Sequence, residues 1–384
     1  MSSVLNESPM FQLSLSSKEL FHSNFLSWII SNYKEEFSGI LSKYILNLKN
    51  DNLNILTVKR EEKNTDITIY FSDDRGNVYK LIIENKVKSI PAYSQLLSYT
   101  SSEKNEYYVL LSLSEPSFQD KNKIYIKEYD KTWSYINYSD LIGILNIANE
   151  TITGKNYYHS QIVADYTTMI KEIRKLLFRD NSRKSRYYFY SEDGKKQIDE
   201  LREVRLHDFF LKLQHEKIAG DILKKLKIAK PSLNYVPNQK WELSKAGQVF
   251  VGSGFTRGSG LSEVKYVLCE RLKSPIILGI QIQGNQFRLF VEAYLEISQK
   301  IAQELEMEKV WFNFEDLNEN PFFGRVEYPV QNNKKFNTFG GTFNYKYLKL
   351  KDIPIDELID IVIDYVMCIH EKKDYIIKVI DRIL

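Results

Sequence analysis

The chain has 384 residues, a length for which two domains are the usual expectation. Of these residues 43% are hydrophobic and 27% are charged, so the chain can bury a core and is not disordered along its length. Its formal net charge of +3 excludes an evenly basic coat for nucleic acid, and any phosphate-binding surface must be a local patch.

The amino-terminal half is predicted to run helix, three strands, helix and strand, with further helices after that. Apolar spacing and the turn residues Ser-Asp-Asp-Arg-Gly-Asn support this order. The run Leu-Ile-Ile-Glu-Asn is apolar on successive positions, which is typical of a strand covered on both faces. The predicted elements are a helix over residues 18–46 that Gly39 could break, strands over 53–60, 66–72 and 78–87, a helix after Pro91, strands over 107–113 and 123–129, and helices over about 138–149 and 158–179.

The carboxy-terminal half has a different pattern, which is rich in strands beyond Pro231. A charged and aromatic segment at 181–196 is the predicted linker, which gives a first domain over 1–180 and an α+β domain of unknown role over 197–384. The glycine-rich stretch at 252–260 lacks the Gly-Lys-Ser/Thr ending of a phosphate loop and lies between strand candidates, so it predicts a hairpin or a flexible substrate loop. The expected elements are a helical stretch over about 197–228, strands over 248–255, 262–268, 275–284 and 286–294, a helix over 296–306, more strands, and a closing helix over about 354–380.

Cysteine content and apolar runs bear on where the protein works. Cys269 and Cys368 lie far apart in the chain and form no C-x-x-C spacing, which predicts free thiols in a reducing compartment. The amino terminus lacks the basic and apolar regions of a signal peptide, and no run approaches about 18 apolar residues. We therefore expect a cytoplasmic protein without a membrane partner.

Three charged residues are predicted to converge at one edge of the amino-terminal sheet. Asp66 opens one strand, and Glu84 and Lys86 lie near the end of the next. Because side chains alternate along a strand, Glu84 and Lys86 share a face, and a hairpin between the two strands brings Asp66 beside Glu84. Glu84 directly follows a buried apolar run, where a charge requires a partner.

Adjacent carboxylates at this edge predict a metal-ion site. Two carboxylates repel each other and raise each other's proton affinity unless a cation lies between them. A hard divalent ion with oxygen ligands, Mg²⁺ first and Mn²⁺ second, resolves this conflict. Such an ion polarises a phosphate oxygen and lowers the pKa of bound water, while Lys86 positions that water or stabilises the developing charge. The pattern therefore predicts hydrolysis of a phosphodiester.

The same residues resemble the motif of a known family. Asp66, followed by a hairpin and the Glu-Asn-Lys triplet at 84–86, resembles the D…(D/E)-x-K signature of the PD-(D/E)xK nuclease superfamily, although Thr65 stands where that signature has proline. The Gln-Leu-Leu-Ser-Tyr sequence at 95–99 resembles the Q-x-x-x-Y motif of its exonuclease-like branches. The resemblance covers roughly residues 15–180, and the fold it implies is α/β, a restriction-endonuclease-like αβββαβ core followed by a second α+β domain.

The resemblance also implies a role for each residue of the motif. The opening helix resembles that of a bacterial subgroup in which a helical glutamate completes the metal site, although Glu19 could equally be an ordinary first-turn glutamate favoured by the helix dipole. His22, on the same side of that helix, is expected to be structural. The implied metal ligands are Asp66, Glu84, the Asn85 backbone carbonyl and Glu19, with Lys86 as the catalytic lysine and Gln95 and Tyr99 orienting Lys86 or the substrate backbone.

The implied function is metal-dependent cleavage of nucleic acid, DNA before RNA, by an endo- or exodeoxyribonuclease that uses Mg²⁺ or Mn²⁺, with antiviral defence as a hypothesis for its role. One alternative stays open: a catalytically idle nuclease fold that binds nucleic acid or protein. Another is a structural protein whose acids only bind metal. Intact Asp66, Glu84 and Lys86 argue against the idle fold. The carboxy-terminal domain could recognise substrate, bind a protein partner or form a homodimer. The basic and aromatic run at 184–190 fits a nucleic-acid groove as well as it fits a packed linker.

Overall fold

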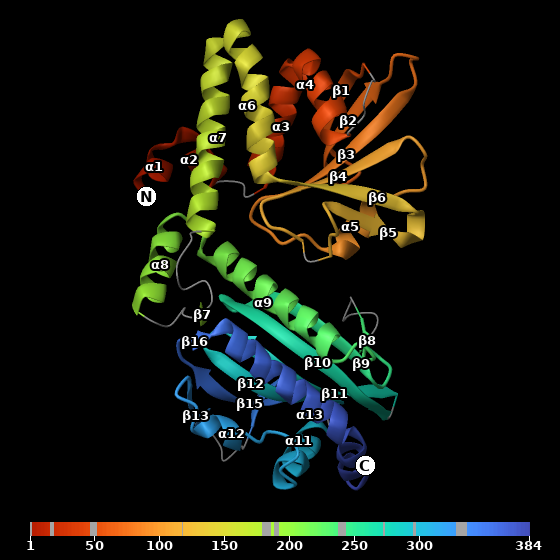
Figure 1. Ribbon diagram of the computed structural model, residues 1–384, viewed down its shortest axis with the longest axis vertical. Helices are drawn as coiled ribbons and strands as arrows, with labels where there is room; N and C mark the ends of the chain where they lie inside the picture. Colours follow the sequence, from red (N-terminus) through yellow and green to blue (C-terminus); the bar gives the residue numbers. More distant parts are fainter. Residues whose placement is uncertain are drawn as a thin grey trace. The chain divides into compact units, whose positions relative to one another are not determined.

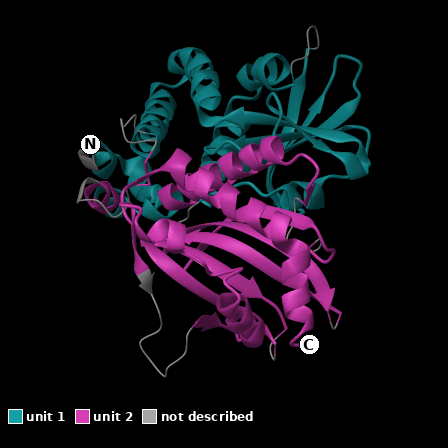
Figure 2. Cartoon of the chain, turned by 60° about the horizontal axis from the view of Figure 1, so that its bottom comes forward, with its two compact units in different colours: residues 1–179, 200–209 teal, residues 180–199, 210–384 magenta. Residues whose placement is uncertain are grey.

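The structure is a computed structural model that describes residues 2–15, 19–46, 52–116, 118–178, 186–187, 192–236, 243–271, 273–294, 297–327 and 336–384. The chain divides into two compact units, the first made of residues 1–179 with 200–209 and the second of residues 180–199 with 210–384 (Figure 2). Most of the predicted linker, like most of the aromatic run at 184–190, lies outside the described residues. The domain limits proposed from the sequence stay predictions.

The first unit is a mixed α/β fold (Figure 1), in which the predicted order of helix, three strands, helix and strand is found from α3 to β4, whereas α1, α2 and β6 were not predicted. It contains one sheet of six strands, and helices precede and follow these strands in the sequence. Its elements are α1 (Ser2–Glu7), α2 (Pro9–Ser14), α3 (Leu20–Asn32), α4 (Lys34–Ile40), a π-helical turn (Leu41–Ile45), β1 (Asn54–Glu62), β2 (Thr65–Ser72), β3 (Val78–Lys86), α5 (Tyr93–Tyr99), β4 (Glu106–Ser112), β5 (Lys123–Ile126), a 3₁₀ turn (Lys127–Tyr129), β6 (Lys131–Asn137), α6 (Tyr138–Lys155) and α7 (Tyr157–Leu177).

Two local predictions for this unit are wrong. The opening helix breaks at Tyr33 instead of Gly39, because Tyr33 takes a non-helical conformation (φ −130°, ψ 49°). Its buried ring anchors that break, with its hydroxyl 2.8 Å from Nδ1 of His159. The predicted strand over 123–129 ends at Ile126, and a strand that was not predicted, β6, follows the 3₁₀ turn.

The sheet of the first unit has the strand order β1-β2-β3-β4-β6-β5. Strands β1, β2 and β3 form antiparallel pairs, whereas β3, β4 and β6 run parallel to one another. The carboxyl ends of these three parallel strands are in register, since Lys86 pairs with Ser112 and Ser112 pairs with Asn137. One edge of the sheet therefore collects the last residues of β3, β4 and β6, the usual place for a site in an open α/β sheet.

Helix α6 starts directly at that edge. Asn137, the last residue of β6, caps the helix because its Oδ1 accepts the backbone N–H groups of Ser139 and Asp140. Asn156 ends α6 and caps α7 in the same way through His159 N–H. The two helices then lie side by side (Figure 1).

The second unit is built on an eight-stranded sheet of order β13-β15-β12-β11-β10-β9-β8, with β14 paired to β15. The predicted hairpin at 252–260 is confirmed: β9 turns into β10 through Arg257 and Gly258, both with positive φ. Helix α13 packs on β10 and β11. The elements are β7 (Arg186–Tyr187), α8 (Glu192–Glu203, shared between the units), α9 (His207–Ala229), β8 (Asn234–Tyr235), β9 (Gln248–Thr256), β10 (Ser259–Arg271), β11 (Ser274–Gln283), β12 (Gln286–Glu292), α11 (Ser298–Met307), α12 (Glu315–Asn318), β13 (Phe323–Glu327), β14 (Asn337–Phe339), β15 (Phe343–Leu350), β16 (Ile353–Pro354) and α13 (Ile355–Asp381).

Two further expectations concern the chain as a whole. Cys269 and Cys368 are both free thiols, as predicted, the first buried and the second half-buried. None of the helices in the described ranges is both long and apolar enough to cross a membrane.

Candidate active site

The β2–β3 hairpin places Asp66 beside Glu84, as the alternation of the strands predicts. Its register pairs Ile67 with Ile83, so the preceding residue of β2 meets the following residue of β3. The backbone N–H of Asn85 donates to Asp66 Oδ2 at 2.7 Å. The register is fixed by the turn, in which Asp73 Oδ1 accepts two backbone N–H groups.

Glu84 is the most buried acid of the site, with 2% of its surface exposed. Its Oε1 accepts hydrogen bonds from Lys86 Nζ at 2.7 Å and from Gln95 Nε2 at 2.9 Å. Its Oε2 is buried and accepts no hydrogen bond from any residue that the structure describes. Burial raises the pKa of Glu84 to about 7, and the Asp66 carboxylate adds to the rise. Burial also raises the pKa of Asp66. The pair therefore carries more negative charge than its surroundings stabilise.

Lys86 is the cation nearest to this pair. Its Nζ lies 2.7 Å from Glu84 Oε1 and 3.9 Å from Glu19 Oε2. Burial opposes its charge, but Glu84, Glu19 and Asp66 outweigh burial and raise the pKa of Lys86. Lys86 is therefore protonated, and one ammonium group faces three carboxyl groups.

Glu19 stands at the amino end of α3, one residue before the first helical residue. Its side chain makes no capping bond to that helix. Instead one carboxylate oxygen accepts the Ser89 hydroxyl and the other faces Lys86. The side chain of Glu19 therefore points toward Ser89 and Lys86 and not toward the first turn of α3.

Helix α5 brings Gln95 and Tyr99 to the same place. The two residues are one turn apart, so they share a face of the helix, and Leu96 packs the other side of α5 into the core of the sheet. Gln95 Nε2 donates both to Glu84 Oε1 and to the Tyr99 hydroxyl, the latter at 3.0 Å. Gln95 thus holds the orientation of Glu84.

All the predicted site residues are in this way linked by contacts, and we call them the acid–lysine cluster. The roles assigned to its members stay predictions. The cluster consists of Glu19, Asp66, Glu84, Asn85, Lys86, Gln95 and Tyr99.

Two neighbours of the cluster, Ser23 and Tyr138, were missed in the sequence. Asn85 is wholly buried, donates its amide to Ser23 Oγ at 3.1 Å and accepts the Tyr138 hydroxyl at 2.6 Å. Ser23 lies four residues after Glu19, a spacing that offered a signal. Tyr138 offered none beyond its place after a strand. His22 is buried, with Nδ1 3.1 Å from the hydroxyl of a buried tyrosine; burial and the nearby Lys88 lower its pKa to about 3. It is a neutral histidine whose Nε2 is buried without a hydrogen-bond partner among the described residues, and its expected structural role stays a prediction.

The donor set of the cluster fits a divalent ion in its chemistry. Among the residues that the structure describes, no three His, Cys, Asp or Glu side chains lie close enough together to hold a metal ion. Lys86 occupies the space between Glu84 and Glu19. The orphaned Glu84 Oε2 is nevertheless a hard oxygen ligand without another partner, and Asp66 lies next to it. A divalent cation would supply the charge that this pair lacks.

The comparison with known families agrees with this geometry. Residues 10–168 match the family model of the PD-(D/E)XK nuclease superfamily, a range that includes the whole acid–lysine cluster. The match indicates phosphodiester cleavage in general and the divalent metal ions that such nucleases generally use. The subgroup suggested by the Q-x-x-x-Y motif stays a prediction. No curated protein matches the chain.

Proposed function

We propose that this protein is a Mg²⁺- or Mn²⁺-dependent nuclease whose substrate is DNA, because residues 10–168 match the family model of the PD-(D/E)XK nuclease superfamily. One observation carries the proposal: Glu84 is buried beside Asp66, and one of its oxygens has no hydrogen-bond partner among the described residues. A buried carboxyl with a pKa raised to about 7 is a costly feature in a structural strand, and perturbed groups of this kind gather at functional sites.

Asp66 and Glu84 would hold the ion through their side chains, and Asn85 through its backbone carbonyl. A bound divalent ion supplies polarisation of a phosphate oxygen and a lowered pKa of a water ligand. Asp66 is already oriented by the Asn85 N–H, and Glu84 by Gln95. These outer contacts fix the direction of the ligand oxygens, which commonly matters for metal affinity.

Lys86 would act on the substrate rather than on the ion. Its ammonium group lies against Glu84 and has three donors, of which one or two can turn to a phosphate oxygen or to the attacking water. Charge that develops on the phosphate is then stabilised by a cation that is held in place before reaction. Glu19, 3.9 Å from Nζ, keeps Lys86 protonated and could accept it when it leaves Glu84.

Cleavage assays test this proposal. Labelled DNA and RNA of the same sequence are incubated with Mg²⁺ and with wild type, Glu84→Ala or Lys86→Ala. The matched control is Lys80→Ala, which removes a lysine from the other end of the same strand, where Lys80 pairs with Glu106. We expect cleavage of DNA by wild type and the control, and none by the two site variants. Calorimetric titration with Mn²⁺ provides a second readout, in which Glu84→Ala should lose binding.

Two outcomes decide against the proposal. Undiminished cleavage by both site variants would contradict the site assignment. Absence of cleavage of any nucleic acid by the wild type, with Mn²⁺ binding retained, would favour the idle binding module. The proposed antiviral role is a separate hypothesis, which phage plating on cells that carry wild type or Glu84→Ala would test.

A further inference from the structure

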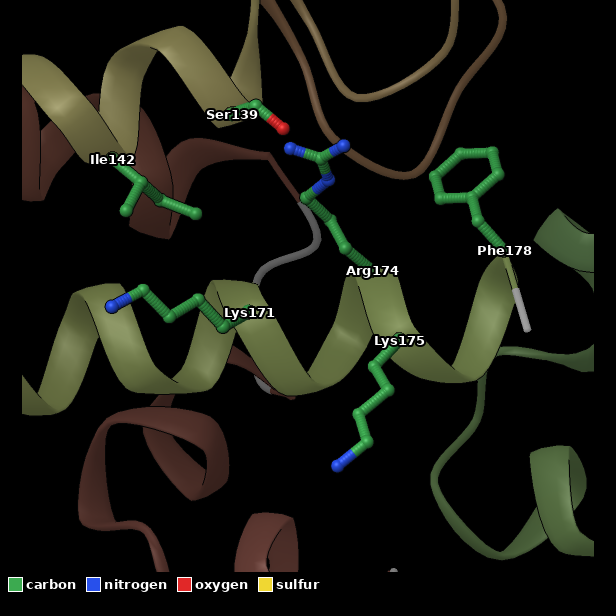
Figure 3. Close-up of a pocket in the computed structure, with 6 residues that line it drawn as sticks. All are labelled: Ser139, Ile142, Lys171, Arg174, Lys175 and Phe178. Atoms are coloured by element: carbon green, nitrogen blue, oxygen red, sulfur yellow. The ribbon is translucent and has the colours of Figure 1, made fainter. Parts of the chain in front are cut away.

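A second cationic feature lies in the first unit outside the acid–lysine cluster, and its basic residues follow the range that matches the family model. It is an open pocket of about 390 Å³ between the start of α6 and the carboxyl half of α7. Its lining is Ser139, Ile142, Lys171, Arg174, Lys175 and Phe178 (Figure 3). We call it the α6–α7 pocket. Its volume is within the range of small-ligand sites.

The spacing of the α7 residues makes one basic stripe. Counted from Lys171, the residues Arg174, Lys175 and Phe178 lie three, four and seven positions further on, so all four lie on one side of the helix. In Figure 3 the Arg174 guanidinium extends toward the Ser139 hydroxyl. Phe178 is 43% exposed at the end of the stripe. Cations beside an exposed aromatic ring are the elements of a surface that follows a nucleic-acid strand.

The stripe has fewer acids than it has cations. Glu172 lies 3.7 Å from Lys175, and Asp140 lies one residue beyond Ser139 on α6. Within the described part of the chain, neither Lys171 nor Arg174 forms an ion pair. The helix dipole favours cations in the last turn of α7, where Arg174 and Lys175 stand. It does not account for Lys171 a turn earlier, nor for Arg174 reaching across to α6.

The pocket is connected to the acid–lysine cluster through one short segment. Tyr138 donates its hydroxyl to Asn85 in the cluster, and Ser139 is the next residue. Asn137 ends β6, two strands from Lys86 along the same edge of the sheet. Two strand spacings amount to about 10 Å, which a nucleic-acid strand covers in about three nucleotides at 3.4 Å each.

We propose that the α6–α7 pocket binds backbone phosphates of the substrate strand about three nucleotides from the bond that is cut, with a base stacked on Phe178. This rests on the proposed function for the identity of the strand, but the binding itself needs no cleavage. Lys171, Arg174 and Lys175 supply the charge for the phosphates. The pocket extends the site along the strand and ties cleavage to substrates long enough to reach it.

The test measures binding without cleavage. Fluorescence anisotropy follows a labelled 20-nucleotide single-stranded DNA in EDTA, with wild type, a Lys171→Gln/Arg174→Gln/Lys175→Gln variant and a control variant of equal charge. The control, Lys121→Gln/Lys123→Gln/Lys127→Gln, changes exposed lysines on and beside β5. We expect the pocket variant to bind at least about tenfold more weakly at low salt, and its log–log salt slope to fall by about 2 at roughly 0.7 per phosphate contact.

Substrate length separates the sources of the effect. With a two-nucleotide DNA, which at about 3.4 Å per nucleotide is too short to cover about 10 Å, wild type and pocket variant should bind alike; a site for free phosphate would affect both lengths equally. Equal losses in the pocket and control variants, or no loss in either, would overturn the proposal. If the wild type cleaves no nucleic acid but the pocket variant alone loses binding, the proposed nuclease function fails and the pocket stands.

Discussion

Strand β3 has a lysine paired with a glutamate at each end, and the pKa of the glutamate is shifted in opposite directions in the two pairs. At the amino end Lys80 Nζ lies 3.1 Å from Glu106 Oε1. The other oxygen of Glu106 accepts the hydroxyls of Ser101 at 2.6 Å and of Tyr108 at 2.5 Å. Burial opposes the charge of Glu106, but these donors outweigh burial and lower its pKa. Both oxygens of this carboxylate therefore have partners.

At the carboxyl end a similar pair is short of positive charge. Lys86 Nζ lies 2.7 Å from Glu84 Oε1, but Asp66 adds a second carboxylate, and no described residue donates a hydrogen bond to Glu84 Oε2. The pKa of Glu84 is raised to about 7 as a result of burial and Asp66, whereas that of Glu106 is lowered. A buried lysine–glutamate pair is therefore no signal of function by itself. The surplus carboxylate is the signal, because it leaves room for a cation that the fold does not provide.

The largest expected difference between the two ends is in catalysis. Glu84→Gln keeps the shape and one acceptor oxygen but removes the charge, so we expect cleavage with Mg²⁺ to fall by about 10²–10³-fold or more. Glu106→Gln makes the same change at the balanced end and should alter the rate by less than about threefold while lowering stability. Initial rates on a labelled DNA duplex measure both. Equal losses in the two variants would remove the distinction.

The second difference concerns pH, in protein kept free of metal by EDTA. The pKa of Glu84 is about 7 in the folded state and 4.5 for the ordinary group, so the folded state binds the proton more tightly. The corresponding stability is complete below about pH 4.5 and is lost as pH rises through 7, by up to about 3 kcal/mol. Urea unfolding of wild type and Glu84→Gln across this window measures the effect of Glu84 together with its neighbours Asp66 and Lys86, since titrations elsewhere in the chain occur in both proteins. A difference that stays constant with pH would contradict the raised pKa.

Metal binding should restore the stability that is lost at high pH, and only through the Glu84 end of β3. An ion at a concentration of about 100 times its Kd stabilises the folded state by about 2.7 kcal/mol. We expect Mn²⁺ to raise the free energy of unfolding of wild type and of Glu106→Gln at pH 8 by this amount. Glu84→Gln should gain little. The measurement is chemical denaturation with Mn²⁺ against EDTA, and equal stabilisation of all three proteins would place the ion elsewhere.

The contacts of the acid–lysine cluster that could be predicted from the sequence are those determined by local backbone geometry. Asp66 and Glu84 meet because strand alternation and the turn at Asp73 determine the register, and Gln95 and Tyr99 meet because helical spacing does. These contacts could be predicted. The Tyr138–Asn85 bond could not, because it joins residues through the packing of a helix on a strand end that no local pattern encodes.

The same reasoning accounts for the local failures. The break at Tyr33 depends on contact with His159 on a distant helix, so the Gly39 position was favoured only by intrinsic propensity. Strand β6 was missed although Trp133 and Tyr135 are buried on alternate positions; the run is short and polar residues interrupt it. The α6–α7 pocket escaped prediction because its lining joins two helices, and the basic stripe alone is typical of a solvated helix end.

The smallest expected effect compares two buried tyrosine hydroxyls. Tyr138 donates to Asn85 at the unbalanced end and Tyr108 donates to Glu106 at the balanced end. Removing either hydroxyl, by Tyr138→Phe or Tyr108→Phe, leaves an acceptor with one donor fewer and should lower the free energy of unfolding by about 1 kcal/mol. Only Tyr138→Phe should also slow cleavage, by a few-fold, because Asn85 carries the N–H that orients Asp66. Urea unfolding and DNA cleavage rates measured on the same preparations separate the two effects. Slower cleavage by Tyr108→Phe would mean that a change at the amino end of β3 also affects catalysis. The effect of the surplus charge at Glu84 would then not be local.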